Sequence, residues 1–131
     1  MSAKKILLVD DEPLVRRSLQ KTLSRAGYEV AVAGGCAEGL LAFEAAEHAG
    51  APFHLAVLDL NMPNFDDREA SGAGLELLSR LVALRPTLPV IMLSAYDEVN
   101  KAREALGRGA RGYCVKGREQ NLVEQIGQML S

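Results

Sequence analysis

Three carboxylates, a hydroxyl and an amine each stand directly after a short apolar run of this sequence. They are Asp10 and Asp11 after residues 6–9, Asp59 after residues 55–58, Ser94 after residues 90–93 and Lys116 after residues 113–115. Carboxylates that gather at one place repel one another unless a cation or a proton compensates their charge. Mg²⁺ usually takes one or two carboxylates together with waters and phosphate oxygens. The residue types therefore predict a Mg²⁺ site if these side chains meet in the fold.

Asp59 is the candidate nucleophile of such a site. A carboxylate beside a bound cation can attack phosphorus, as in enzymes that form an aspartyl phosphate. The metal and Lys116 would spread the charge on the phosphoryl oxygens, and Ser94 could donate a hydrogen bond to one of them. The phosphate donor must come from outside, because residues 107–112 spell G-x-G-x-x-G between a helix and a strand, the reverse of a nucleotide-binding loop.

The elements that would position these side chains alternate along the chain. Apolar runs typical of buried parallel strands lie at 6–9, 30–33, 55–58, 90–93 and 113–115, and helical spacing of apolar residues lies at 15–26, 40–43, 75–82, 99–106 and 122–130. This alternation predicts an α/β fold, a doubly wound five-stranded parallel sheet with five helices on its two faces. Ligands bind outside the carboxyl ends of such strands, so the polar residues named above should share one edge.

Length and composition limit the other functions. The 131 residues, 48% of them hydrophobic, suit one domain over 1–131 with its own core. The net charge of −2 lacks the basic surplus of a direct nucleic-acid binder, and no apolar run is long enough for a membrane span. The two cysteines, Cys36 and Cys114, suggest neither a disulfide framework nor a zinc site. We expect a cytoplasmic protein.

The chain resembles the response regulator receiver domain of two-component signalling over nearly its whole length. The matching segments are ILLVDDE at 6–12, LDLNMP at 58–63, LSA at 93–95 and GARGYCVK at 109–116. Each is a modest signal alone, but their order at successive strand ends makes them strong together. The resemblance implies a flavodoxin-like, CheY-like fold with strand order 2-1-3-4-5.

The resemblance also assigns roles around the nucleophile. It implies that Asp59 is the phosphoacceptor and that Asp11 and Asp59 bind Mg²⁺ directly, together with the backbone carbonyl of Asn61. Asp10 would act largely through a metal-bound water, and Lys116 would bind the phosphoryl group. The donor would be a sensor histidine kinase or a histidine phosphotransfer protein. The protein would then be a switch that catalyses only its own phosphorylation and dephosphorylation.

Three further residues would connect the phosphoryl group to a partner. By the resemblance, Ser94 is the switch hydroxyl and Tyr113 the switch aromatic, and together they remodel the face made by the fourth helix, the fifth strand and the fifth helix. A downstream protein would bind that face. Tyr96 lies where the family controls access of water to the phosphoryl group, so we expect slow self-dephosphorylation. The sequence leaves open whether phosphorylation also drives homodimer formation.

Two departures from the family border the site. The loop after Pro63 carries an insertion, 64–71, before the glycines at 72 and 74; we interpret its acidic residues as a solvated surface excursion. Lys116 is followed by Gly117 where the family usually has a proline in a cis peptide. Without proline, a cis bond would cost roughly 2.5–4 kcal/mol, so we expect a trans peptide and a more mobile loop.

Three other functions share parts of this pattern. A pseudo-receiver that serves only in protein interaction or dimerisation would keep the fold without the chemistry, but the complete set of Asp10, Asp11, Asp59, Ser94 and Lys116 speaks against it. In a flavodoxin-type carrier, the acidic residues after the first strand would repel a flavin phosphate. An aspartate-based phosphohydrolase would need a cap or further loops, for which this chain is short.

Overall fold

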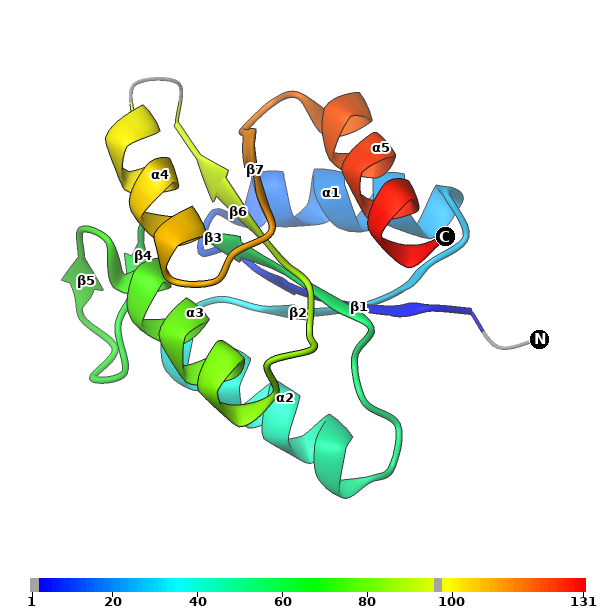
Figure 1. The fold of residues 1–131 in the computed structure, drawn as a ribbon, viewed down its shortest axis with the longest axis horizontal. Coiled ribbons are helices and arrows are strands. Elements are labelled where there is room, and N and C mark those ends of the chain that lie inside the picture. The colour runs from blue at the N-terminus through cyan, green and yellow to red at the C-terminus, as the bar shows by residue number, and fades with distance from the viewer. Residues whose placement is uncertain (1–2, 96–97) are drawn as a thin grey trace.

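A five-stranded parallel sheet forms the centre of the molecule (Figure 1). The structure is a computed structural model that describes residues 3–95 and 98–131. Its strands run in the order β2-β1-β3-β6-β7, with bounds β1 Lys5–Val9, β2 Glu29–Ala33, β3 Leu55–Asp59, β6 Val90–Ser94 and β7 Gly112–Val115. These are the five expected strands, and their order matches 2-1-3-4-5 once the two strands of a small hairpin are set aside. The predicted fold class is confirmed.

Five helices cover the two faces of this sheet (Figure 1). Their bounds are α1 Pro13–Arg25, α2 Cys36–His48, α3 Ala73–Leu84, α4 Val99–Gly107 and α5 Glu119–Leu130. Successive strand residues point to opposite faces, so Ile6 and Leu8 pack with α1 and α5, whereas Leu7 and Val9 pack with α2 and α3. The central strands are buried on both faces, which is why the sequence shows them as continuous apolar runs.

The insertion and the two residues before it form a hairpin, which the sequence pattern did not indicate. Strands β4 (Met62–Pro63) and β5 (Glu69–Ala70) pair antiparallel. The turn between them is closed by Asn64, whose Oδ1 accepts hydrogen bonds from the backbone nitrogens of Asp66 at 2.9 Å and Arg68 at 3.1 Å. Two residues per strand are too few for a pattern of alternation, so this hairpin leaves no periodic signal in the sequence. It lies beyond the sheet end toward which the arrows of β3 and β6 point in Figure 1.

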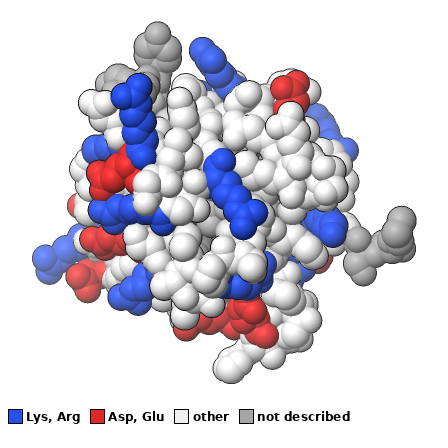
Figure 2. Space-filling view, in the orientation of Figure 1, with Lys and Arg blue, Asp and Glu red and all other residues white. Residues whose placement is uncertain are grey.

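Basic and acidic side chains are both scattered over the face that Figure 2 shows. Cys36 and Cys114 are free and buried, in line with the expectation of no disulfide framework. Within residues 3–95 and 98–131, no helix has the length and apolar character needed to cross a membrane.

Helix α3 begins in contact with the backbone that follows β3. The Gly74 nitrogen donates a hydrogen bond of 2.9 Å to the carbonyl of Leu60. A Cβ at position 74 would collide with the carbonyl oxygen of Asp59 and the Cα of Leu60. Glycine is therefore required here for close approach, and the contact fixes the direction in which the chain leaves Asp59.

Replacing Gly74 with alanine is expected to lower the free energy of unfolding by about 1–3 kcal/mol or more, because the added methyl group meets backbone rather than a movable side chain. Gly127→Ala is the matched control. Gly127 lies inside α5 with open space around it, so its replacement should raise stability by roughly 0.5–1 kcal/mol. Urea unfolding of both variants measures this difference, and equal effects at the two positions would contradict the close approach.

Candidate functional site

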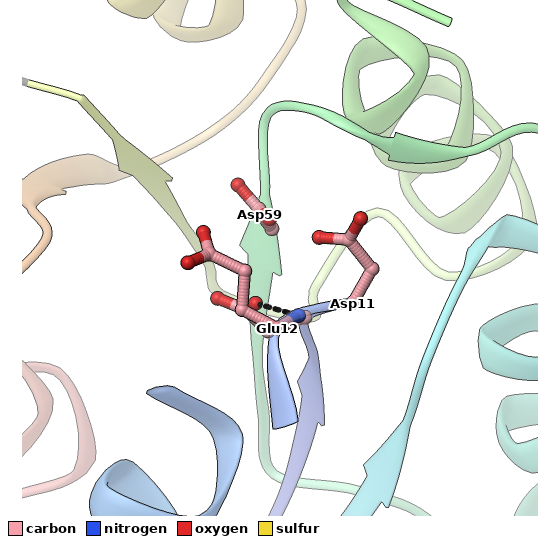
Figure 3. Close-up of side chains that lie close together, drawn as sticks. Asp11, Glu12 and Asp59 are labelled. Atoms are coloured by element: carbon pink, nitrogen blue, oxygen red, sulfur yellow. Dashed lines mark hydrogen bonds between the residues drawn. The ribbon is translucent and has the colours of Figure 1, made fainter. Parts of the chain in front are cut away.

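Four carboxylates meet at the carboxyl ends of β1 and β3. Asp10, Asp11, Glu12 and Asp59 each offer one oxygen, and these oxygens all lie within 4.8 Å of one another. Figure 3 shows Asp59 between Glu12 on one side and Asp11 on the other. Strands β1 and β3 pair in parallel, so their ends are adjacent and their polar residues are brought together. This is the clustering that the sequence predicted for Asp10, Asp11 and Asp59.

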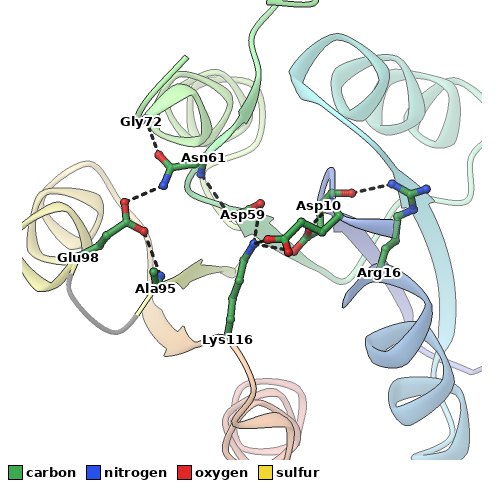
Figure 4. Close-up of polar contacts among 9 residues, drawn as sticks. Asp10, Arg16, Asp59, Asn61, Gly72, Ala95, Glu98 and Lys116 are labelled. Carbon is green, nitrogen blue, oxygen red and sulfur yellow. Dashed lines mark hydrogen bonds and ion pairs between the residues drawn. The ribbon is translucent and has the colours of Figure 1, made fainter. Parts of the chain in front are cut away.

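Lys116 reaches the same group of carboxylates from the end of β7 (Figure 4). Its Nζ donates hydrogen bonds to Asp59 Oδ2 at 3.0 Å and to Glu12 Oε1 at 2.6 Å, and it lies 3.4 Å from Asp10 Oδ2. Its backbone nitrogen is held by the Ser94 carbonyl at 2.9 Å. The Lys116–Gly117 peptide is trans, as expected, and Gly117 has a φ of 94°.

Asp59 is almost completely buried, with 2% of its surface exposed. Its Oδ1 accepts a hydrogen bond of 3.3 Å from the Asn61 nitrogen. Burial and the nearby charge of Asp10 raise the pKa of Asp59 to about 7, and the contact with Lys116 only partly offsets this rise. The ionised form of Asp59 is thus disfavoured, because the amine of Lys116 offsets only part of the cost of burial and of the nearby carboxylate.

Asp10 is fully buried and incompletely paired. Its Oδ1 accepts a hydrogen bond from the Glu12 nitrogen at 2.8 Å, whereas its buried Oδ2 has no hydrogen-bond donor among the described residues and faces the Lys116 amine only as an ion pair at 3.4 Å. Burial raises the pKa of Asp10, although the Glu12 nitrogen and the charge of Lys116 act in the opposite direction. A buried carboxylate oxygen without a donor is rare in folded proteins and points to a cation or water at this place.

The carboxylates surround Lys116 and hold it protonated. Burial lowers the pKa of Lys116, but its hydrogen bonds to Glu12 and Asp59 and the charges of Asp59 and Asp10 outweigh burial. The net pKa lies above the ordinary value for a lysine. The amine is therefore a permanent cation, suited to binding an anion and unsuited to acting as a base.

A cleft of about 300 Å³ opens onto this group. Its walls are formed by Asp11, Glu12, Asp59, Asn61, Glu69, Ala95, Glu98 and Lys116. The cleft is therefore strongly acidic, with one amine inside it. Its volume and its oxygen-rich walls suit a hydrated divalent cation and a phosphoryl-sized anion together.

Comparison with known proteins shows the family of this chain. The family model described as the response regulator receiver domain matches residues 6–127. The chain belongs to this family. The receiver domain protein (CheY-like) from Methanospirillum hungatei has a similar structure, with a TM-score of 0.82 and 34% identity over 98% of this chain and 94% of that one.

Other receiver proteins extend the likeness. FleR, a response regulator protein of Pseudomonas aeruginosa, is 39% identical over 87% of this chain and 22% of its own length. TrrA of Thermotoga maritima, a response regulator solved in complex with Mg²⁺-BeF, aligns with a TM-score of 0.76 and 28% identity over 96% of this chain and 98% of that one. The chain spans about a fifth to a half of the length of the curated relatives it matches.

The remaining predicted site residues differ in whether they line the cleft. Ser94 is 2% exposed at the end of β6, where its neighbour Leu93 pairs with Asp59, but it does not line the cleft. Tyr113 lies in the edge strand β7 and is 38% exposed. Asn61 lies in the cleft wall, two residues after Asp59. Tyr96 falls outside the described residues.

Sequence reasoning missed three acidic residues of the cleft. Glu12 pairs with Lys116, and it follows directly on the two aspartates, so adjacency was a usable signal. Glu69 comes from the hairpin that was interpreted as a surface excursion, and it borders the cleft. Glu98 contacts Asn61, 37 residues away in sequence. Contacts of this kind depend on side-chain conformations and carry no signal in residue spacing.

The raised pKa of Asp59 predicts that, in EDTA, the receiver loses stability as pH rises. Between the ordinary aspartate pKa and about pH 7, Asp59 keeps its proton in the folded state but has lost it in the unfolded chain. Increasing pH therefore favours unfolding in that range. Asp59→Asn removes this penalty. The variant should therefore gain about 1–3 kcal/mol over the wild type between pH 5 and pH 8.

Urea unfolding of both proteins at pH 5 and pH 8, in EDTA, measures this gain. Comparison with Asp59→Asn isolates the one carboxylate from all other titrating groups. A difference between the two proteins that stays constant with pH would show that Asp59 titrates normally.

Proposed function

We propose that this receiver domain is a phosphorylation-dependent switch that accepts a phosphoryl group on Asp59 from a sensor histidine kinase or a histidine phosphotransfer protein, in a Mg²⁺-dependent reaction. The carrying observation is the placement of the buried Asp59 between an amine at 3.0 Å and three further carboxylates, all four offering oxygens within 4.8 Å of one another. Such an arrangement combines a nucleophile with a binding site for an anion and a cation.

The residues present fit a magnesium ion. The buried Asp10 Oδ2 without a hydrogen-bond donor and the convergence of carboxylate oxygens supply the hard ligands that this ion prefers. Asp11, Asp59 and the backbone carbonyl of Asn61 would hold it directly, and Asp10 through a water. Bound there, Mg²⁺ would offset the charge of the carboxylates and of the phosphoryl oxygens.

The chain's own side chains would carry out the transfer. A carboxylate oxygen of Asp59 attacks the phosphorus of a phosphohistidine, so that an O–P bond forms as the P–N bond breaks and the imidazole leaves with the electron pair. Lys116 donates hydrogen bonds to the phosphoryl oxygens, and Ser94 donates another after moving toward them. Because Lys116 stays protonated, its contribution is electrostatic.

The output follows from a shift between two arrangements. A phosphoryl group that is bound better when Ser94 and Tyr113 are in the active arrangement favours that arrangement by the difference in binding free energy. The remodelled face would comprise α4, β7 and α5, where Tyr113 is already partly exposed, and a downstream protein would bind it. Homodimer formation through this face is one form that the output could take.

The pseudo-receiver alternative is not favoured, because Asp10, Asp11, Asp59 and Lys116 are gathered at one edge of the sheet. We also place the protein in the cytoplasm, which agrees with its free buried cysteines. It would act as a switch and not as a turnover enzyme, and Tyr96 would shield the phosphoryl group from water.

Incubation with phosphoramidate or acetyl phosphate and Mg²⁺ should add one phosphoryl group, visible in the intact mass. The adduct should be absent in Asp59→Asn and in wild-type protein kept in EDTA. An adduct that persists in Asp59→Asn would assign the acceptor elsewhere. The complete lack of an adduct with either donor would favour the pseudo-receiver, and steady release of phosphate from small phosphoesters would favour a phosphohydrolase.

Mg²⁺ should stabilise the wild type at pH 8 by about 2.7 kcal/mol when its concentration is a hundred times the dissociation constant. Asp11→Asn removes a proposed direct ligand and should lose most of this gain. Asp66→Asn, the same change in the hairpin turn away from the cleft, should keep it. Thermal unfolding in a Mg²⁺ titration measures all three proteins, and equal stabilisation of the two variants would argue against the proposed ligand set.

A further inference from the structure

The side chain of Glu98 connects the loops that follow β6 and β3 (Figure 4). Its Oε1 accepts a hydrogen bond of 3.0 Å from the Ala95 nitrogen, and its Oε2 accepts one of 2.7 Å from Asn61 Nδ2. Only 16% of this side chain is exposed. One carboxylate oxygen thus bonds within the loop that follows β6, and the other joins this loop to a segment 37 residues away in the sequence.

Asn61 continues the connection on the other side. Its Oδ1 accepts a hydrogen bond of 2.9 Å from the Gly72 nitrogen, at the start of α3. The four residues Ala95, Glu98, Asn61 and Gly72 therefore form one chain of hydrogen bonds, which we call the Asn61–Glu98 clamp. Ala95 is the residue after Ser94 and Asn61 is the second after Asp59, so the clamp joins the ends of the two strands that carry the proposed switch hydroxyl and the phosphoacceptor.

The clamp also places a negative charge in the wall of the cleft. Glu98 and Asp59 line the same space, and the nearest cation to Glu98 is Lys101, with its Nζ at 3.9 Å. This lysine is more than a third exposed, so water screens its charge and weakens the compensation. A phosphoryl group on Asp59 would add negative charge opposite Glu98. Repulsion between the two would act against the arrangement in which the clamp is closed.

We propose that the Asn61–Glu98 clamp holds the end of β6 in the resting arrangement and that the phosphoryl group on Asp59 opens it. Glu98 is then a positioning residue that acts on Ser94 through Ala95. This inference rests on the proposed function of Asp59. The free energy of the closed clamp opposes binding of the phosphoryl group, so loosening the clamp makes a phosphoryl analogue bind more tightly.

Glu98→Gln tests this with little change of shape. The single oxygen of a glutamine amide cannot accept from Ala95 and Asn61 with the geometry of two carboxylate oxygens, and the negative charge is removed. Glu104→Gln is the matched control: it makes the same change inside α4, the helix that Glu98 precedes, where Glu104 is exposed and pairs only with Arg108 among the described residues. The probe is beryllofluoride with saturating Mg²⁺, titrated into each protein and measured by calorimetry.

We expect Glu98→Gln to bind beryllofluoride about ten times more tightly than the wild type, or more, from the loss of one charge-assisted hydrogen bond. Glu104→Gln should match the wild type. Equal or weaker binding by Glu98→Gln would overturn the clamp. Wild-type protein that binds no beryllofluoride in the presence of Mg²⁺ would instead overturn the proposed function itself, and the clamp with it.

A second variant separates the clamp from simple charge repulsion. Asn61→Ala keeps the backbone groups and the charge of Glu98 but removes the donor, and Gly72 is exposed enough for water to replace its partner. It should tighten beryllofluoride binding as Glu98→Gln does, and the double variant should gain less than the product of the two single effects. Wild-type affinity in Asn61→Ala would show repulsion alone and contradict the clamp. Urea unfolding verifies that each variant is folded.

Discussion

The burial of like charge at one edge of the sheet is the constraint on which this molecule depends. The neighbouring parallel strands β1 and β3 end at the same edge of the sheet, so the residues at their carboxyl ends lie close together. Here these residues are aspartates. Asp10 and Asp59 have almost no contact with water, and Lys116 is the amine placed among them. Charges held in this way destabilise the fold unless a cation or a proton joins them. The same unfavourable arrangement makes the site receptive to a metal ion.

The rest of the fold holds this arrangement in place. Two apolar layers, one on each face of the sheet, fix the strands so that their ends cannot relax away from one another. Behind Asp59, the start of α3 lies directly on the backbone, and Gly74 is the residue that permits it. The rigid side of the cleft is therefore built from main chain and core. The opposite side, formed by Ala95 and Glu98, is held by side-chain hydrogen bonds that can exchange partners. Such a division suits a site in which one wall must stay and the other must move.

The sequence predicted what depends on periodicity and on strand ends. Apolar runs located the five strands, their alternation with helices predicted the parallel sheet, and the polar residue after each run predicted the meeting of Asp10, Asp11, Asp59 and Lys116. What it could not predict depends on contacts without a repeating pattern. The hairpin of β4 and β5 is too short for alternation, and the place of Glu98 depends on a hydrogen bond to a residue 37 positions away. The roles of Ser94 and Tyr113 as switch residues stay predictions, because one arrangement of the chain does not display a movement.

The sharing of Lys116 among Asp59, Glu12 and Asp10 has a consequence for selectivity. An ammonium group has three N–H donors, and here its two hydrogen bonds and its longer ion pair with Asp10 already face three carboxylates. An incoming anion can gain a donor only by displacing one of these oxygens, so each contact formed is matched by one released. An anion therefore binds Lys116 only if its contact with the amine is more favourable than the carboxylate contact that it displaces. Discrimination between a tetrahedral anion and a planar one then depends on how well the oxygens of each anion match the directions of the three N–H bonds.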